Sequence, residues 1–95
     1  MNYHRLVFRK HALQRMFERN VRVEDVEAAL KTGRTIAEYP DDKPCPSRLI
    51  LGTTKGRKLH VVIAENIEEN EGIVITVYEP DSTQWKEGFE RRKTP

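Results

Sequence analysis

The chain has little cysteine and no long apolar stretch, and both features narrow the classes of protein it can belong to. A single cysteine, Cys45, rules out an internal disulfide, and the histidines show no zinc-ligand spacing. No apolar run reaches membrane length, and the first eight residues lack the apolar core of a secretory leader. We therefore expect a cytoplasmic protein of one domain, residues 1–95, with no metal or cofactor.

Net charge is also small, at +2, but its distribution along the chain is uneven. Residues 1–34 carry eight Lys and Arg against four Asp and Glu, whereas residues 65–79 carry five acids and no base. A basic region suits an anionic partner such as RNA. Solvated helix faces give the same composition, so charge alone leaves both interpretations open.

The spacing of apolar residues predicts two helices, over residues 10–20 and 23–31. Asn20 is expected to end the first helix, and Gly33 the second. Arg22 stands where a Ser, Thr or Asp cap is usual, so the second helix is expected to fray at its start. The first helix would bury Ala12, Leu13, Met16 and Phe17, and it would leave His11, Arg15, Glu18 and Arg19 at the surface.

The rest of the chain reads mainly as strands. Residues 35–39, 48–54, 58–64 and 72–78 are short and rich in β-branched side chains, and residues 2–8 form a short edge strand or a lead-in. Lys55 and Gly56 make a tight hairpin, and residues 40–47 and 65–71 form loops. Asp81 or Ser82 would cap a last helical turn holding Trp85 and Phe89. We expect an α+β fold with two N-terminal helices packed on one face of a four-stranded antiparallel sheet.

Strand alternation divides the side chains of this sheet between two faces. One face is uniformly aliphatic and is expected to lie under the helices: Leu49, Leu51, Leu59, Val61, Ile63, Ile73, Ile75 and Val77. The other face is mixed and is expected to be more open: Arg48, Ile50, Lys58, His60, Val62, Thr76 and Tyr78.

The mixed face holds groups suited to RNA cleavage without a metal. That reaction needs a base for the ribose 2′-OH, a cation for the charge on phosphorus, and an acid for the leaving oxygen. His60 is a candidate acid or base, Arg48 can hold a phosphate, and Tyr78 can donate a proton or stack on a base. Thr76 can add a hydrogen bond.

The same side chains have ordinary structural interpretations. His60 can be a hydrogen-bonded strand residue, Tyr78 can be half-buried packing, and Arg48 can pair with a nearby aspartate. His11 and Arg15 lie one turn apart and can simply belong to the solvent-exposed face of a helix.

Several segments together resemble the DUF4258 family, a domain of unknown function. They are HALQRM at 11–16, ERNV at 18–21, EDVEAAL at 24–30, EYPDDKP at 38–44, PSR at 46–48, LHVV at 59–62 and ITVYEPD at 75–81. The resemblance runs from about residue 11 to residue 85. Cys45 departs from it, where an aromatic or bulky residue is expected between two prolines, and Arg22 replaces the usual cap.

The resemblance implies a RelE- or BrnT-like layout, that of toxins that cleave mRNA. It also implies a partner, a zinc-finger antitoxin of the YgiT type, similar to the partner of the MqsR toxin. The recurring polar positions that it implies are His11, Arg15, Tyr39, residues 40–42, Ser47, Arg48, His60, Tyr78 and Glu79.

We therefore expect a metal-independent endoribonuclease, the toxin of a toxin–antitoxin pair; whether it is a monomer or a dimer is left open. The expected catalytic residues are His60, Arg48, Tyr78 and His11, and the expected RNA-binding residues are Arg15, Arg19, Tyr39 and Thr76. The alternative is a non-catalytic module of the same fold that binds protein or nucleic acid. The catalytic hypothesis requires Arg48, His60 and Tyr78 to converge on the open face of the sheet.

Overall fold

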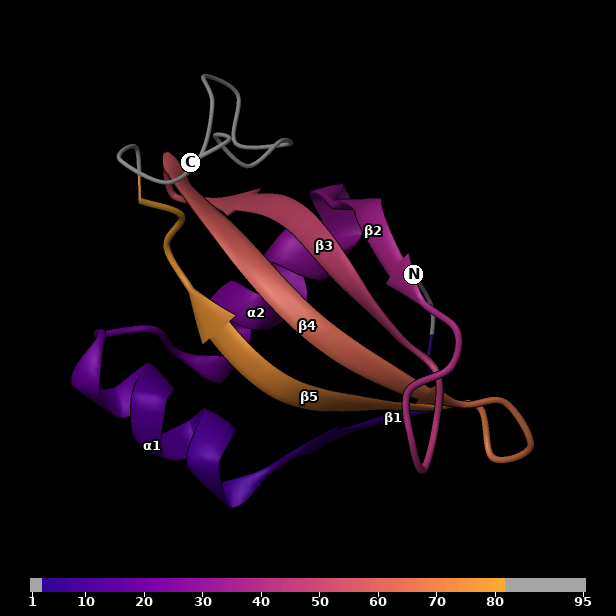
Figure 1. Ribbon diagram of the computed structural model, residues 1–95. Coiled ribbons are helices and arrows are strands. Elements are labelled where there is room, and N and C mark those ends of the chain that lie inside the picture. Colours follow the sequence, from indigo (N-terminus) through magenta and orange to yellow (C-terminus); the bar gives the residue numbers. More distant parts are fainter. Residues whose placement is uncertain (1–2, 82–95) are drawn as a thin grey trace.

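The computed structural model describes residues 3–81 of the chain. Figure 1 shows the elements, which follow in the order β1 (Arg5–Phe8), α1 (Lys10–Glu18), α2 (Val23–Thr32), β2 (Arg34–Tyr39), β3 (Ser47–Thr54), β4 (Arg57–Asn66) and β5 (Glu71–Tyr78). The helical turn expected after Pro80, with Trp85 and Phe89, lies outside these residues. No helix within residues 3–81 has the length and apolar character needed to span a bilayer.

The expected four-stranded antiparallel sheet is wrong, because over residues 3–81 the sheet has five strands and is mixed. Its order is β1-β5-β4-β3-β2, so the first strand lies at one edge and pairs with the last. β1 runs parallel to β5, with Arg5 opposite Glu71 and Phe8 opposite Val74. The other three pairings are antiparallel. A short edge strand was one of the two alternatives predicted for residues 2–8, and β1 confirms that alternative.

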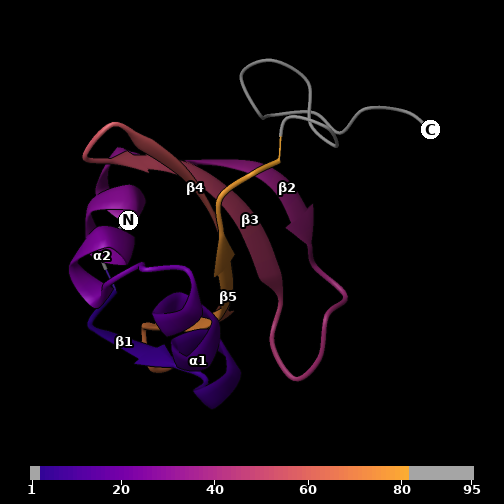
Figure 2. The same cartoon turned by 90° about the vertical axis from the view of Figure 1, so that its left-hand side faces the viewer.

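The helices are also packed differently from the expectation. α2 lies across β3 and β4, whereas α1 lies along β5, and the two helices barely touch each other (Figures 1 and 2). The reason is the position of β1. Because α1 begins just after a strand at the β5 edge, α1 must lie over that edge, and the short link after it carries the chain across to β3.

Local backbone conformations confirm one predicted helix end and one predicted turn. Asn20, just beyond α1, has a φ of 57°, in the left-handed region that Asn tolerates at helix ends. Lys55 and Gly56 have φ values of 49° and 79°, as a two-residue hairpin turn requires. This turn places Thr54 opposite Arg57 and fixes the register of β3 against β4.

That register divides the sheet into two faces that differ from the predicted ones. Directly opposed residues share a face, and Ile50 lies opposite Val61 while Leu51 lies opposite His60. We call the side packed into the hydrophobic core the core face; it carries Arg48, Ile50, Leu59, Val61, Ile63, Val74 and Val77. We call the other side the outer face; it carries Leu49, Leu51, His60, Val62, Thr76 and Tyr78.

One glycine on β3 and one aspartate on α2 explain how closely α2 packs on the sheet. A Cβ on Gly52 would lie 2.0 Å from the main-chain oxygen of Ala29, so only glycine fits there. Asp25 is buried, and its carboxylate accepts hydrogen bonds from the Arg22 amide at 2.9 Å and the Thr54 hydroxyl at 3.1 Å. Arg22 makes no side-chain cap hydrogen bond, as its residue type predicts, and Asp25 in the first turn of α2 binds the Arg22 amide instead.

Candidate active site

The outer face brings His60 and Tyr78 together from neighbouring strands. They are directly opposed in β4 and β5, and His60 Nδ1 lies 3.3 Å from the Tyr78 hydroxyl oxygen. The rings meet edge to face, with centroids 5.2 Å apart and an interplanar angle of 73°. His60 is fully buried, whereas Tyr78 is half-buried. A ligand on this face can therefore reach the phenol but not the imidazole behind it.

Arg19 approaches Tyr78 from the end of α1. Its Nη1 donates a hydrogen bond of 2.7 Å to the main-chain oxygen of Val77, the residue before Tyr78. Arg19, Tyr78 and Glu79 line a hollow of about 510 Å³ in the surface. A guanidinium, a phenol and a carboxylate thus share one recess, and we call it the Tyr78 hollow.

The wall of the Tyr78 hollow is held in place by Arg57, at the start of β4. Its Nε donates to Glu79 Oε1 at 2.8 Å, and its Nη1 donates to the main-chain oxygen of Asn20 at 3.0 Å. It also donates to the main-chain oxygen of Arg19 at 3.3 Å. One guanidinium therefore connects the end of α1 to the end of β5. With two guanidinium groups and one carboxylate, these residues leave an excess of positive charge that suits a phosphate.

The expected convergence of Arg48 with His60 and Tyr78 is wrong. Arg48 lies opposite Ile63 on the core face, whereas His60 and Tyr78 lie on the outer face. The two-residue hairpin at Lys55 causes this, since it sets odd-numbered residues of β3 against even-numbered residues of β4. Arg48 is thereby separated from His60 by the thickness of the sheet.

Arg48 instead belongs to a partly buried polar cluster with Tyr3 and Glu65. Its Nη2 donates to the Tyr3 hydroxyl at 3.0 Å and to Glu65 Oε2 at 2.8 Å, and Tyr3 donates to the same carboxylate at 3.0 Å. Burial raises the pKa of Tyr3. Burial alone would lower the pKa of Arg48, but the hydrogen bond with Tyr3 and the charge of Glu65 outweigh it and raise that pKa. These contacts hold the chain before β1 against β3 and β4.

The remaining predicted site residues fall into three places. Thr76 is half-buried on the outer face, opposite Val62 and two residues before Tyr78. Tyr39 shares that face but lies at the far end of β3, opposite Ser47. His11 and Arg15 are exposed on α1, and Arg15 lies 3.7 Å from Glu18.

His11, Arg15 and Arg19 follow one another at four-residue spacing along α1 and its C-terminal end. Residues so spaced lie on one side of a helix, about 6 Å apart along its axis. They form a basic row, and its last member, Arg19, lines the Tyr78 hollow.

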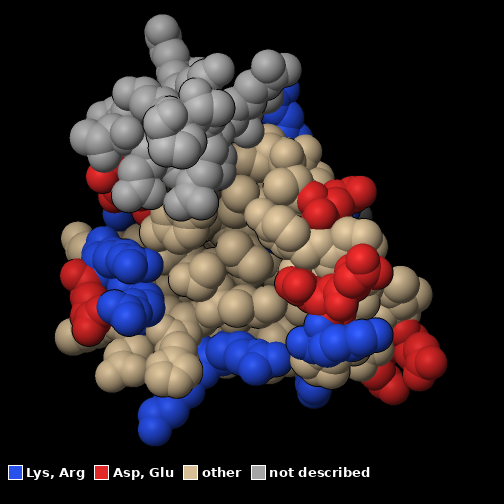
Figure 3. Space-filling model, in the orientation of Figure 1, with Lys and Arg blue, Asp and Glu red and all other residues tan. Residues whose placement is uncertain are grey.

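The charge pattern of the outer face agrees with this placement. Figure 3 shows Lys and Arg side chains over α1 and along the neighbouring edge, and an uncharged middle over the strands. Acidic side chains gather toward the opposite side of this view, and a few also lie beside the Lys and Arg side chains on the α1 side (Figure 3). The Lys and Arg side chains around α1 would therefore attract a polyanion to that side of the molecule.

Sequence reasoning missed Arg57 and gave Glu79 no role beyond a recurring polar position. One signal was available for Arg57. Arg57 comes directly after the two-residue turn, so it begins a strand. In an antiparallel sheet the start of one strand lies beside the end of the next, and Glu79 stands at that end.

Comparison with known proteins gives one positive finding. The sequence model of the DUF4258 family, described as a domain of unknown function, matches residues 8–79. No curated protein and no solved structure matches the chain.

Proposed function

Because the chain belongs to the DUF4258 family, which is described only as a domain of unknown function, we propose its function from geometry: it is a metal-independent endoribonuclease acting at the Tyr78 hollow. The observation that carries the proposal is that the phenol of Tyr78, the guanidinium of Arg19 and the carboxylate of Glu79 line one recess. A cation, a base and a weak acid are the three groups that this reaction requires.

The proposed reaction uses the nucleophile of the substrate itself. The Glu79 carboxylate takes the proton of a ribose 2′-OH, and the resulting oxygen attacks the adjacent phosphorus. The bond from phosphorus to the 5′-oxygen breaks, and that oxygen takes a proton from the Tyr78 phenol. The products are a 2′,3′-cyclic phosphate and a 5′-hydroxyl end. Arg19 holds the phosphate and stabilises the charge that grows on it.

His60 and Arg57 have positioning roles in this proposal. The buried imidazole of His60 contacts the Tyr78 hydroxyl and fixes its orientation. Arg57 holds the Glu79 carboxylate at the rim of the hollow. Neither group needs to touch RNA.

The test is cleavage of a 5′-labelled single-stranded RNA in the presence of EDTA. Tyr78→Phe, Arg19→Gln and Glu79→Gln are each expected to lower the cleavage rate constant about 100-fold or more. Tyr3→Phe is the matched control for Tyr78→Phe, because it removes a phenol hydroxyl from the polar cluster on the core face. It is expected to leave the rate unchanged. The 5′-labelled product must end in a 2′,3′-cyclic phosphate, and RNA with 2′-O-methyl groups must resist cleavage.

The basic row on α1 favours a second function, RNA binding without cleavage. His11 and Arg15 are exposed, with Arg15 3.7 Å from Glu18, whereas Arg19 and Arg57 donate to main-chain oxygens. In this case RNA binds but stays intact. The logarithm of the affinity would fall with the logarithm of salt concentration, and Arg15→Gln would reduce that slope by about 0.7.

The zinc-finger antitoxin implied by the family resemblance enters here as a proposal as well. A partner that inhibits cleavage is expected to cover the Tyr78 hollow and to compete with RNA for Arg19. Growth arrest on expression of the chain, relieved by co-expression of such a partner, would support the pairing. Relief by a partner that leaves RNA binding intact would contradict it.

A further inference from the structure

A second recess lies between β1 and α2, away from the Tyr78 hollow. It has a volume of about 400 Å³, and we call it the β1 groove. Its lining residues come from the start of the chain, β1 and α2: Tyr3, His4, Arg5, Leu6, Phe8, Val23, Glu27, Leu30 and Lys31. None of them lines the Tyr78 hollow.

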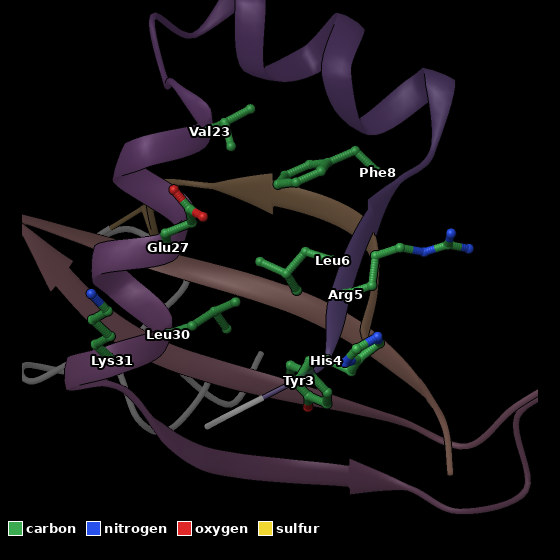
Figure 4. Close-up of a pocket in the computed structure, with 9 residues that line it drawn as sticks. All are labelled: Tyr3, His4, Arg5, Leu6, Phe8, Val23, Glu27, Leu30 and Lys31. Atoms are coloured by element: carbon green, nitrogen blue, oxygen red, sulfur yellow. The ribbon is translucent and has the colours of Figure 1, made fainter. Parts of the chain in front are cut away.

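The side chains of the β1 groove are arranged as two facing apolar walls. Figure 4 shows Leu6 and Phe8 from β1 and Val23 and Leu30 from α2 extending toward the space between them. Arg5 extends away from it (Figure 4). The space is therefore apolar inside, with charge at its margin.

β1 borders this groove with an edge that carries no further strand within residues 3–81. Among the described residues, β1 is the terminal strand of the sheet and pairs only with β5. The Arg9 amide donates to the Val74 oxygen of β5 at 3.1 Å. Since main-chain groups alternate in direction along a strand, those of Leu6 and Phe8 point away from β5. They are available to an added strand.

The other edge of the sheet is protected, which makes the contrast informative. β2 has a register shift between Thr35 and Ala37, carries charge at Arg34 and Glu38, and is followed directly by Pro40. Bulges, charged side chains and proline are the devices by which proteins block edge pairing. β1 has a regular register over its four residues and an apolar groove beside it.

We propose that the β1 groove binds an extended segment of another protein, which pairs with β1 and places alternate apolar side chains between β1 and α2. This is the strand-addition mode of peptide recognition, in which main-chain hydrogen bonds give affinity and pockets give specificity. The volume of about 400 Å³ suits a few aliphatic side chains with their main chain lying along β1.

Charge selects the class of partner. Arg9 follows the apolar part of β1, and Lys31 stands on the α2 side of the groove against one acid, Glu27. Arg5 extends away from the groove and is paired with Glu71. Two copies of this chain joined through β1 would bring these cations together. A segment with acidic residues flanking its apolar positions would neutralise them. The partner is therefore a different protein with an acidic, alternating segment.

The experiment selects binders from a phage-displayed library of random linear 12-residue peptides on the full chain. Enriched peptides are expected to share alternating apolar residues with flanking Asp or Glu. Each synthetic peptide is then titrated into ¹⁵N-labelled protein. The largest amide shifts are expected at Leu6, Phe8 and Val23, and hydrogen exchange at Leu6 and Phe8 is expected to slow.

Two variants make the outcome decisive. Val23 is 39% exposed, so Val23→Glu places a charge in the groove without burying it, and it is expected to weaken peptide binding at least tenfold. Leu13 is 45% exposed on α1 and does not line the groove, so Leu13→Glu is the matched control and is expected to keep full affinity. The proposal is overturned by any of four results: no enrichment, shifts elsewhere, binding unaffected by Val23→Glu, or a dimer formed through β1.

Discussion

Arg48 offers the sharpest test of the fold, because the observed register removes it from the proposed catalytic site. Arg48→Met keeps an unbranched apolar stem but removes the guanidinium, with its charge and all of its side-chain donors. The variant loses hydrogen bonds to Tyr3 and Glu65, and a third of 3.3 Å to Thr35. The structure thus predicts lower stability and an unchanged rate of RNA cleavage.

The expected loss of stability depends on how far the cluster of Arg48, Tyr3 and Glu65 is exposed to solvent. Hydrogen bonds to charged groups contribute about 1.5–3 kcal/mol each when buried. The side chains of Arg48 and Glu65 are 25% and 28% exposed, so solvent screens part of this. A loss of about 2 kcal/mol in the free energy of unfolding is a reasonable sum for these contacts. For a domain of this size it corresponds to a decrease in Tm of roughly 8–16 °C.

The assay pairs urea denaturation with RNA cleavage at a temperature where the variant stays folded. Arg48→Lys is the control that keeps the charge but loses the forked geometry, and it is expected to fall between wild type and Arg48→Met. Two results would refute the reasoning. One is an unfolding free energy within about 0.5 kcal/mol of wild type. The other is loss of cleavage by a folded variant, which would return Arg48 to the active site.

Three further predictions test the packing of α2 and the surface of α1. Gly52→Ala is expected to cost at least about 2 kcal/mol, since the added methyl meets the Ala29 carbonyl, and denaturant titration would measure it. The hydrogen bond from the Arg22 amide holds the pKa of Asp25 below its usual range, so its stabilisation is present above about pH 4 and is lost as pH falls through the folded-state pKa. Asp25→Asn should therefore give a shallower loss of Tm in acid, and an unchanged acid profile would contradict this. Phe17 is 89% exposed, so Phe17→Ser should change the unfolding free energy by less than about 0.5 kcal/mol; a larger loss would mean that Phe17 packs against the domain.

The two-residue turn at Lys55 and Gly56 contained enough information to predict the register of β3 against β4. Lys55 and Gly56 were predicted as a tight hairpin, and such a turn places Thr54 opposite Arg57. Counting back from that pair sets Arg48 opposite Ile63, on the core face. The information that separates Arg48 from His60 was therefore local and available, but simple alternation within each strand overlooked it.

Which residues of β5 lie on each face of the sheet depends on a register shift that no local sequence pattern indicates. The register of β4 against β5 shifts between Val62 and Ile63. This shift lets both Val74 and Val77 reach the core, although they lie three residues apart, while Thr76 and Tyr78 stay on the outer face.

Length, apolar spacing and turn residues by themselves determined both helices, the three central strands and their hairpins, because these depend on contacts between near neighbours in the chain. Only the tertiary structure decided that β1 pairs parallel to β5 and that Arg19 and Glu79 meet beside Tyr78. Those contacts join residues about 60 or more positions apart. Such pairings reflect the burial of shared surface, which is a property of the whole fold and leaves no periodic signal in either segment.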